Sequence, residues 1–195
     1  MELYKLDEAG YDAAITGNLL SFRPTRQSET LSHFLASFTE EKKKKVALKL
    51  KSQGGGENKF LEAIDTWWVI QAPRMWWSQF DTYRHALLLG VDESVSLSQS
   101  TMHNILSRPL TQTDFEEPIE CDYLRVLNQW IRNKSFREIK LGLPESYLQI
   151  RIYKLNYSVL RNICQQREFH RLSHEWGIFI DTVKERVDHP ELLEE

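Results

Sequence analysis

The sequence predicts an α+β fold for this chain of 195 residues, the length of one domain or of two closely packed halves. One observation is the strand-like segment 63–71, AIDTWWVIQ, in which the pattern alternates and β-branched and aromatic residues are frequent. The other is that several further segments repeat apolar residues every three or four positions, the spacing of amphipathic helices. No internal repeat or low-complexity linker divides the chain, so residues 1–195 are expected to form a single domain.

The first 30 residues show little periodicity and are interpreted as a strand or loop, followed by a short helix that begins at Ser28. The helix is predicted because apolar residues recur at helical spacing. Four of them share one face: Leu31, Phe34, Leu35 and Phe38.

Residues 39–51 predict a lysine-rich helix. Glu40 and Lys44, and likewise Glu41 and Lys45, stand four residues apart, the spacing of stabilising ion pairs on a helix. The lysine run is therefore interpreted as a solvated face, with an anion-binding role as the minor alternative. The glycine-rich segment that follows is a break, and it lacks the Gly-Lys-Ser/Thr ending of a phosphate-binding loop.

After the strand, an amphipathic helix is predicted between Pro73, which suits a first turn, and Gly90, which suits a helix end. Its apolar stripe consists of Trp76, Phe80, Tyr83 and Leu87. Residues 91–104 are polar and are interpreted as a loop before another helix. Residues 118–132 are amphipathic and place on one face Leu124, Leu127 and Ile131.

The segment from Tyr147 to about residue 188 is interpreted as strongly helical. A first apolar stripe has helical spacing and contains Ile152, Leu155, Val159 and Ile163. A second stripe contains Leu172, Trp176, Phe179, Val183 and Val187.

Composition excludes several classes of protein. The net charge of −3 gives no overall basic field, so nucleic acid is not expected as a partner. Cys121 and Cys164 lack CxxC spacing and are too few for a disulfide framework, so two reduced thiols are expected, with Cys164 as a small core residue. No apolar run reaches transmembrane length and no signal-peptide pattern is present, so no membrane contact and a cytoplasmic location are expected.

Arg167 is an anomaly, because the first C-terminal stripe reaches it four residues after Ile163. Asn156 lies near the same face. An arginine that faces a core needs an anion, since it keeps its charge. That anion is either a protein carboxylate, which periodicity alone favours, or a substrate phosphate, whose oxygens fit the guanidinium.

His170 and His174 stand four residues apart, and Glu175 follows them. A shared helical face would let both histidines bind a metal, but the pattern matches no zinc-protease motif and no third ligand is identified. Structural or substrate-contacting histidines are therefore favoured over a zinc site. His103 lies in a polar segment, where a histidine with the ordinary pKa is expected, and it is interpreted as a site residue or as a surface histidine.

Two segments together resemble the flavin-dependent thymidylate synthases. The first, residues 60–84 continued at 98–103, resembles a strand, an Ala-Pro turn, a Q-x-x-R-H-R helix and an E-x-S-x-R-Y loop; the matching residues are Ala72, Pro73, Gln79, Arg84 and Ser100. The second, residues 143–176, resembles an L-P pair, N-x-R-x-x-x-N-F-L and an arginine before an A-Q-x-E-I helix; the matching residues are Leu143, Pro144, Asn156, Asn162, Arg167 and Glu175. The resemblance covers residues 40–187.

The resemblance implies the family's fold, a small antiparallel sheet packed with long helices. It also implies the family's reaction, in which a flavin carries a hydride and a reduced folate supplies one carbon to C5 of dUMP without a cysteine nucleophile. FAD, reduced folate, NADPH, a pyrimidine deoxynucleotide and a homotetramer with sites between subunits follow from the same resemblance. The residues implied for the nucleotide are Gln79, Ser100, Lys140 and Arg167, and those implied for the flavin are Tyr83, Arg84, Asn156 and Asn162.

The sequence departs from the family pattern at charged positions. Thr82 and Tyr83 replace the first Arg-His of the triplet, and Ser98 and Met102 replace the glutamate and arginine of the following loop. A divergent enzyme acting on a pyrimidine deoxynucleotide is the leading hypothesis, and a homologue without catalysis that binds a nucleotide or a partner is the second. The third, which the net charge opposes, is a module that stacks single-stranded bases on the pairs Trp67-Trp68 and Trp76-Trp77.

Overall fold

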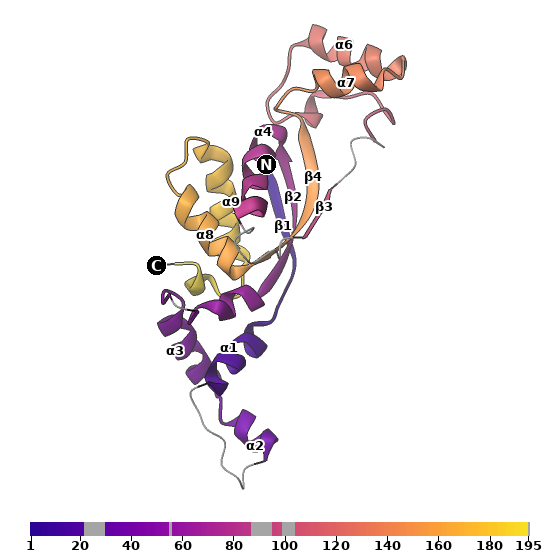
Figure 1. The fold of residues 1–195 in the computed structure, drawn as a ribbon. Helices are drawn as coiled ribbons and strands as arrows, with labels where there is room; N and C mark the ends of the chain where they lie inside the picture. The colour runs from indigo at the N-terminus through magenta and orange to yellow at the C-terminus, as the bar shows by residue number, and fades with distance from the viewer. Residues whose placement is uncertain (22–29, 55, 87–94, 99–103, 195) are drawn as a thin grey trace. The chain divides into compact units, whose positions relative to one another are not determined.

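The computed structural model describes residues 1–21, 30–54, 56–86, 95–98 and 104–194, with only the backbone described at 84–86 and 95–98 (Figure 1). The chain divides into two compact units. Unit 1 consists of Met1–Tyr4 and Val69–Tyr153, and unit 2 of Lys5–Trp68 and Lys154–Glu195. The single domain expected over residues 1–195 stays a prediction. Within the described ranges, no helix combines the length and hydropathy needed to cross a membrane.

Four strands of the described chain form one sheet in the order β1-β2-β4-β3 (Figure 1). Alternation explains β2, because every second residue from Thr66 to Ala72 is buried and the residues between them are half-buried. The fold class, α+β with a small antiparallel sheet packed with long helices, is confirmed. The strands are β1 (Glu2–Ala9), β2 (Asp65–Pro73), β3 (Val95–Ser98) and β4 (Leu148–Asn156).

Strand β4 contradicts the helix predicted from Tyr147 onward. Its sequence, LQIRIYKLN, places apolar residues at every second position as well as at helical spacings, so the periodicity fitted both structures. The segment is a strand in the structure because it pairs with β2 and β3. Ile152 and Leu155, predicted on one helical stripe, therefore point to opposite faces of the sheet.

Two further elements lie where none was predicted. Helix α1 (Tyr11–Leu20) occupies part of the region interpreted as strand or loop. Only Ile15 and Leu19 of its ten residues are buried, which is too weak a stripe to detect. Strand β3 crosses the segment interpreted as a loop, because its alternation extends over only four residues.

Helix α4 (Arg74–Ala86) begins directly after Pro73, so the proline closes β2 instead of opening the helix. The N–H of Arg74, left without an intrahelical partner, donates to the carbonyl of Tyr147 at 3.1 Å. The predicted stripe is confirmed by the burial of Trp76, Phe80 and Tyr83. Two positions of this prediction, Leu87 and Gly90, lie outside the described residues.

Unit 1 has a separate hydrophobic cluster around helices α6 (Cys121–Arg132) and α7 (Phe136–Gly142), which pack against each other. The 3-10 turn η3 (Gln112–Asp114) lies in the segment that leads to α6. The amphipathic helix predicted at 118–132 is confirmed. The buried members of the cluster are Ile105, Leu110, Phe115, Leu127, Ile131, Ile139 and Leu143.

Unit 2 is a set of packed helices. Helix α1 packs against α3 (Glu40–Leu50) and the 3-10 turn η1 (Lys59–Ala63), and η1 packs against α8 (Tyr157–Arg167). Helix α8 packs against α9 (Ser173–Arg186), which also contacts η4 (Pro190–Leu192). The second C-terminal stripe is confirmed by the burial of Trp176, Phe179, Val183 and Val187.

The two cysteines are free, as expected. Cys164 is buried on α8, and burial raises the pKa of its thiol to about 11. The thiol therefore remains protonated near neutral pH and acts as a small core residue. Cys121 is exposed at the start of α6.

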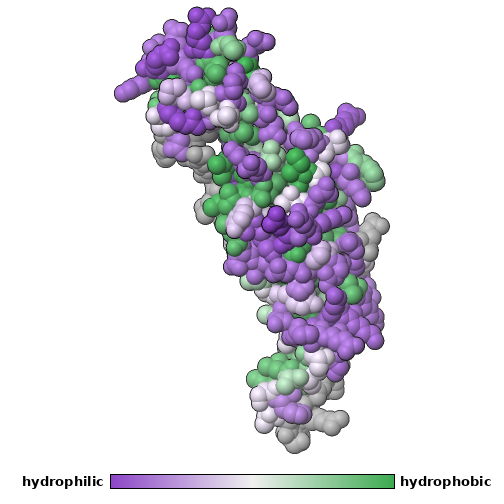
Figure 2. All heavy atoms as spheres, turned by 180° about the vertical axis from the view of Figure 1, so that it is seen from behind, coloured by the Kyte–Doolittle hydropathy of each residue, from purple (hydrophilic) through white to green (hydrophobic). Residues whose placement is uncertain are grey.

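Helix α2 (Leu31–Ala36) starts later than predicted, after its cap residue Thr30. Phe34 is buried, as predicted, whereas Leu31 and Leu35 are 69% and 40% exposed. Figure 2 shows the hydrophobic atoms on the surface around this helix. Only half of the predicted apolar face is therefore covered.

The lysine run on α3 is a solvated face, as interpreted from the sequence. The expected pair between Glu40 and Lys44 is wrong. Glu40 binds Lys43 at 2.7 Å, and Lys43 also reaches Asp12 of α1 at 2.9 Å. Lys44 lies 3.7 Å from Glu191 instead.

Candidate functional site

Asn156 joins strand β4 to helix α8. Its Oδ1 accepts a hydrogen bond from the backbone N–H of Val159 at 2.9 Å, so the side chain caps the helix. The residue is 1% exposed, and its Nδ2 has no hydrogen-bond partner in the described part of the chain. A buried donor without an acceptor costs about 1–3 kcal/mol, so an acceptor from a ligand or water would be stabilising here.

Asn162 lies on the exposed side of α8. Its Oδ1 accepts a hydrogen bond from Nε2 of Gln166 at 2.8 Å, one helical turn later. The two asparagines implied for the flavin thus share a helix but differ in environment. Asn156 is part of the fold, and Asn162 is accessible to a ligand.

Arg167 lies in the last turn of α8 and is half-buried. Its guanidinium carbon stands 4.9 Å from the ring centroid of Trp176, a fully buried residue of α9. The stripe that continues from Ile163 therefore does not carry Arg167 into the core. The charge lies instead over an aromatic face, where a cation–π interaction stabilises it.

His170 lies in the turn between α8 and α9. Its Nδ1 accepts a hydrogen bond from the backbone N–H of Leu172 at 3.1 Å, and its ring meets Trp176 edge to face at 6.0 Å. Desolvation lowers the pKa of His170, and the charges of Arg167 and Arg171 lower it further. Two guanidinium groups therefore act on the imidazole at this turn.

The predicted shared helical face of His170 and His174 is wrong. His174 belongs to α9, whereas His170 precedes the helix, because the chain turns after Arg167. Among the residues that the structure describes, no three His, Cys, Asp or Glu side chains form a group that could hold a metal ion. A turn separates the two histidines, and the periodicity of the sequence does not indicate that turn.

Together, Arg167, His170, Arg171 and Trp176 form a surface that we call the α8–α9 junction. Two guanidinium groups and an imidazole lie at a turn, with an indole ring beneath one of them. Guanidinium groups bind phosphate oxygens through charge-assisted hydrogen bonds. The junction is chemically suited to hold a phosphate or another anion.

Helix α4 of unit 1 contains three further motif residues, Gln79, Tyr83 and Arg84. Gln79 is half-buried, and Tyr83 is 5% exposed with its ring 6.4 Å from that of Phe80. Arg84 is the helix residue next in sequence, but its side chain is not among the described groups. Ser100 and His103 lie outside the described residues.

The residues that replace the family's Arg-His are used within α4. The hydroxyl of Thr82 donates to the carbonyl of Gln79 at 2.7 Å, and Tyr83 packs in the aromatic cluster. Neither side chain projects a positive charge. Both side chains are therefore part of the local structure of α4.

A polar cluster around Asp81 was missed in the sequence. Asp81 on α4 accepts hydrogen bonds from Arg151 at 2.9 and 3.0 Å and from the hydroxyl of Tyr153 at 2.7 Å. Arg151 also lies 4.3 Å above the ring of Trp77. Alternate residues of β4 face α4, so recognising β4 as a strand would have placed Arg151 and Tyr153 together.

Lys140 lies on α7 and is half-buried. Burial lowers the pKa of its ammonium group, and the charge of Arg74 lowers it further. An anion bound near Lys140 would oppose both effects. The anion-binding role that the resemblance implies for Lys140 stays a prediction.

The tryptophan pairs do not form a stacking platform. Trp68, Trp76 and Trp77 are each at most 1% exposed. Trp77 donates from its indole to the carbonyls of Ala72 and Gln149 at 3.0 and 3.3 Å. Three of the four rings considered are core residues, so base stacking on both pairs is excluded.

Comparisons with known proteins find no matching family model and no matching curated protein. Solved structures match closely in fold. The flavin-dependent thymidylate synthase of Helicobacter pylori, solved with FAD and dUMP, has 15% sequence identity, a TM-score of 0.73, and coverage of 100% of this chain and 98% of its own. A second structure of that synthase with FAD and dUMP has the same identity and TM-score and 97% coverage of its chain.

A UMP/dUMP methylase of Streptomyces cacaoi, solved with 5-bromo-UMP, is also similar. Its identity is 11%, its TM-score is 0.58, and the alignment covers 94% of this chain and 87% of the methylase. The match to the Helicobacter pylori synthase extends along nearly all of both chains. The chain has the fold of the flavin-dependent thymidylate synthases.

Proposed function

We propose that this protein binds FAD and a pyrimidine deoxynucleotide of the dUMP type and transfers a one-carbon unit to C5 of the base. The observation that carries the proposal is the whole-chain fold match to a synthase solved with FAD and dUMP. The similar methylase, solved with 5-bromo-UMP, supports the same class of substrate. At these identities the match establishes the fold, and the ligands are the proposal.

For the nucleotide, the proposal places the phosphate at the α8–α9 junction, on Arg167. Desolvation and the charges of Arg167 and Arg171 lower the pKa of His170. Two guanidinium groups near this imidazole support a phosphate at this position. Gln79, Ser100 and Lys140 would complete the nucleotide site. Burial and the charge of Arg74 lower the pKa of the Lys140 ammonium group, and a bound anion would oppose both effects.

For FAD, the fit is tested by the amides of α8. Nδ2 of Asn156 is a buried donor without an acceptor in the described chain, and Asn162 presents an exposed amide. Flavin carbonyls and phosphates are acceptors, so the donors fit the group. Tyr83 and Arg84 would provide the remaining contacts, with FAD supplying hydride chemistry when it is bound.

The co-substrates and assembly complete the proposal. Reduced folate would be the carbon donor and NADPH the reductant, with a homotetramer bringing residues of neighbouring subunits to each site. In the family resemblance the flavin and nucleotide sites lie between subunits. A purely monomeric protein with full activity would contradict this part.

The first test is the absorbance spectrum of the purified protein, before and after addition of FAD, together with calorimetric titration of dUMP. Flavin absorbance that stays with the protein after gel filtration, and saturable binding of dUMP, are expected. A colourless protein that binds neither FAD nor dUMP would refute the proposal.

A second candidate function is nucleotide binding without catalysis. It is favoured by Thr82 and Tyr83, which are used in the structure of α4 where the family carries a charged pair. Turnover separates the two candidates. Release of tritium from dUMP labelled at C5, dependent on FAD and a reductant, supports catalysis, and binding without release supports the second candidate.

A further inference from the structure

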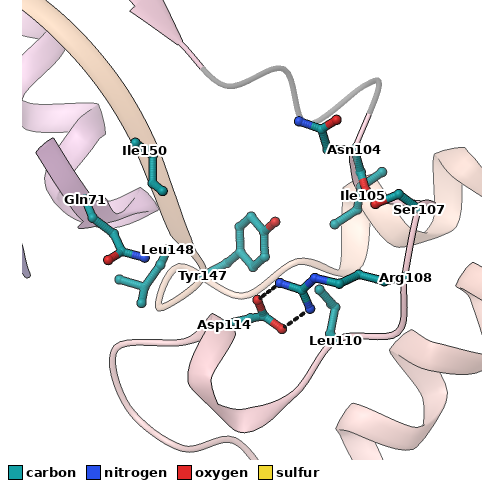
Figure 3. Close-up of a pocket in the computed structure, with 10 residues that line it drawn as sticks. All are labelled: Gln71, Asn104, Ile105, Ser107, Arg108, Leu110, Asp114, Tyr147, Leu148 and Ile150. Carbon is teal, nitrogen blue, oxygen red and sulfur yellow. Dashed lines mark hydrogen bonds and ion pairs between the residues drawn. The ribbon is translucent and has the colours of Figure 1, made fainter. Parts of the chain in front are cut away.

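Polar groups that are paired within a protein need no ligand. In the pocket of unit 1 that Figure 3 shows, Arg108 and Asp114 are paired in this way, through hydrogen bonds of 2.5 and 2.9 Å. Asn156 of unit 2 differs, because its buried Nδ2 has no hydrogen-bond partner in the described chain. A ligand can use this donor only where the residues around Asn156 hold it in place.

The backbone is held on both sides of Asn156. The carbonyl of Leu155 accepts a hydrogen bond from the hydroxyl of Thr66 at 2.7 Å. The N–H of Tyr157 donates to the carbonyl of Ile64 at 3.0 Å. Each neighbour of Asn156 is thus bonded to the segment that leads into β2, within unit 2.

The hydroxyl of Tyr157 connects the first turn of α8 to two other segments. It donates to Oε1 of Glu8, near the end of β1, and accepts from the backbone N–H of His189 at 3.1 Å. Burial raises the pKa of Tyr157, and the hydrogen bond to Glu8 raises it further, so the hydroxyl is protonated near neutral pH. One phenol, which is 0% exposed, therefore joins α8, β1 and the chain that follows α9.

Glu8 binds the same part of the chain a second time. Its Oε2 accepts from the backbone N–H of Asp188 at 2.9 Å and from Nζ of Lys5 at 3.0 Å. Lys5 also reaches Oδ1 of Asp188 at 2.6 Å. The side chain of Glu8 is only 4% exposed, and hydrogen bonds to a charged group are stronger where water is excluded.

Lys51 holds the chain further along. Its ammonium group donates to the carbonyls of Glu191 and Glu194 at 2.7 and 2.9 Å, and the residue is 8% exposed. The carbonyl of Lys51 accepts from the guanidinium of Arg161. Arg161 follows Tyr157 by four residues, so both lie on one side of α8.

Residues 188–194, which we call the strap, are therefore bonded to α8 at two levels. The start of the strap is bonded to Tyr157, and its end is bonded to Arg161 through Lys51. Between them, η4 packs against α3 and α9, and Leu192 and Leu193 are 1% and 2% exposed. Movement of α8 at Asn156 would have to break these contacts.

We propose that the strap holds the N-terminal end of α8 in the position at which Nδ2 of Asn156 meets FAD, with Tyr157 as the positioning residue. The ligand in this inference rests on the proposed function. Tyr157 acts through Asn156, its neighbour in the chain. Weaker docking of the strap should therefore weaken FAD binding, although no group that contacts the flavin has been removed.

Two variants of the full-length protein test the strap at its two levels. Tyr157→Phe removes the hydroxyl, and Lys51→Met removes the ammonium group while it keeps an apolar side chain. The matched controls are Tyr4→Phe, at a tyrosine that is 66% exposed, and Lys49→Met, at an exposed lysine of α3. Because Lys51 lies outside α8, an effect of Lys51→Met at Asn156 can only be transmitted by other residues.

The first measurement is the dissociation constant of FAD, from the quenching of flavin fluorescence. The second is the NMR signal of the Asn156 side-chain amide in the ligand-free protein, assigned with Asn156→Ser. Tyr157→Phe should raise the dissociation constant about five- to tenfold, the effect of one lost hydrogen bond, and should shift the Asn156 signal. Lys51→Met should change both in the same direction, and the controls should change neither.

A merely structural role of the strap gives a different result. Both variants would then have a lower free energy of unfolding but the wild-type dissociation constant and the wild-type Asn156 signal, and this outcome would overturn the proposal. If Tyr157→Phe does not fold, Lys51→Met decides. If the wild-type protein bound no FAD, the proposed function would fail, and the Asn156 signal would decide alone: a shift in Lys51→Met supports the strap, and an unchanged signal overturns it.

Discussion

Helices α4 and α8 belong to the two motif segments of this chain, and their polar residues have different environments. On α8, Asn156 caps the helix and leaves a buried donor without an acceptor in the described chain, and Arg167 holds its charge over an aromatic face at a turn. On α4, Thr82 bonds to its own helix and Tyr83 is buried among aromatic rings.

The two helices therefore differ in whether their polar residues are available to a ligand. The α8 segment keeps polar groups whose chemistry suits a phosphorylated ligand. In the α4 segment, Thr82 and Tyr83 stand where the family pattern has Arg-His, and both are part of the local structure. We therefore expect substitutions on α8 to affect ligand binding and substitutions on α4 to affect stability. The predictions below test this contrast, ordered by their expected effect on stability.

The largest effect is expected from Trp176→Ala. Trp176 is fully buried on α9 and supports Arg167, so its removal leaves a cavity beneath the α8–α9 junction. Loss of a buried tryptophan costs about 3–5 kcal/mol of unfolding free energy. Urea denaturation measures it, with Phe169→Ala, at a residue 93% exposed in the same turn, as the control that should change nothing. Equal stability of the two variants would mean that the junction is not built on Trp176.

Asn156→Ala comes next. Removing the cap should destabilise the protein by about 1–2 kcal/mol, and Asn156→Ser should recover most of this because serine also caps a helix. FAD titration then separates the cap from the donor. If Nδ2 serves the flavin, both variants bind FAD more weakly than the wild type. Full FAD affinity in Asn156→Ser would restrict Asn156 to its structural role.

The features that could be predicted from the sequence differ between helices α4 and α8. Helix α4 was predictable because its stripe of large aromatic residues is continuous and Pro73 marks the end of the strand before it. The polar cluster of Asp81 was not, because it depends on β4, a strand whose spacing also fits a helix. The segment is a strand because it pairs with neighbouring strands, and a local sequence pattern contains no information on that pairing.

Helix α8 shows the reverse. Its polar residues were located through the resemblance, and the structure places Asn156 at the N-cap of α8 and Asn162 and Arg167 on the helix. The environment of Arg167 was not predictable, since a periodic stripe indicates a face and not where the helix ends. The turn that begins after Arg167 is what leaves its charge half-exposed and moves His170 off the helix.

Asp81→Ala tests the structural side of the contrast. It removes the partner of Arg151 and Tyr153, and because the side chain of Asp81 is 42% exposed, a loss of about 1 kcal/mol is expected. Tyr153→Phe removes only the hydroxyl and should cost less. Thermal denaturation measures both. Dissociation constants for dUMP should stay at the wild-type value in both variants, and a large loss of affinity in Asp81→Ala would show that α4 also retains a binding role.

Arg167→Ala tests the binding side. The side chain is half-buried in the last turn of α8, and its cation–π contact with Trp176 contributes about 0.5–1 kcal/mol, so a small change in the free energy of unfolding is expected. Affinity for dUMP should fall at least about tenfold if the guanidinium binds the phosphate, and affinity for uridine should not change. Arg125→Ala, on the exposed side of α6, is the control. A loss of folding as large as the loss of binding would instead make Arg167 a structural residue.

The smallest effect on stability is expected from the titration of His170. Its pKa is lower in the folded chain than in the unfolded one, so the unfolded state binds the proton more readily, and stability is complete above the ordinary histidine pKa and decreases as the pH falls below it. His170→Gln should remove this part of the pH dependence. A phosphate bound at the junction would add negative charge near His170, and dUMP should therefore raise the pKa of His170, whereas uridine should not. Proton NMR titration, with His170→Gln used to assign the signal, measures both shifts, and an equal response to dUMP and uridine would place the phosphate elsewhere.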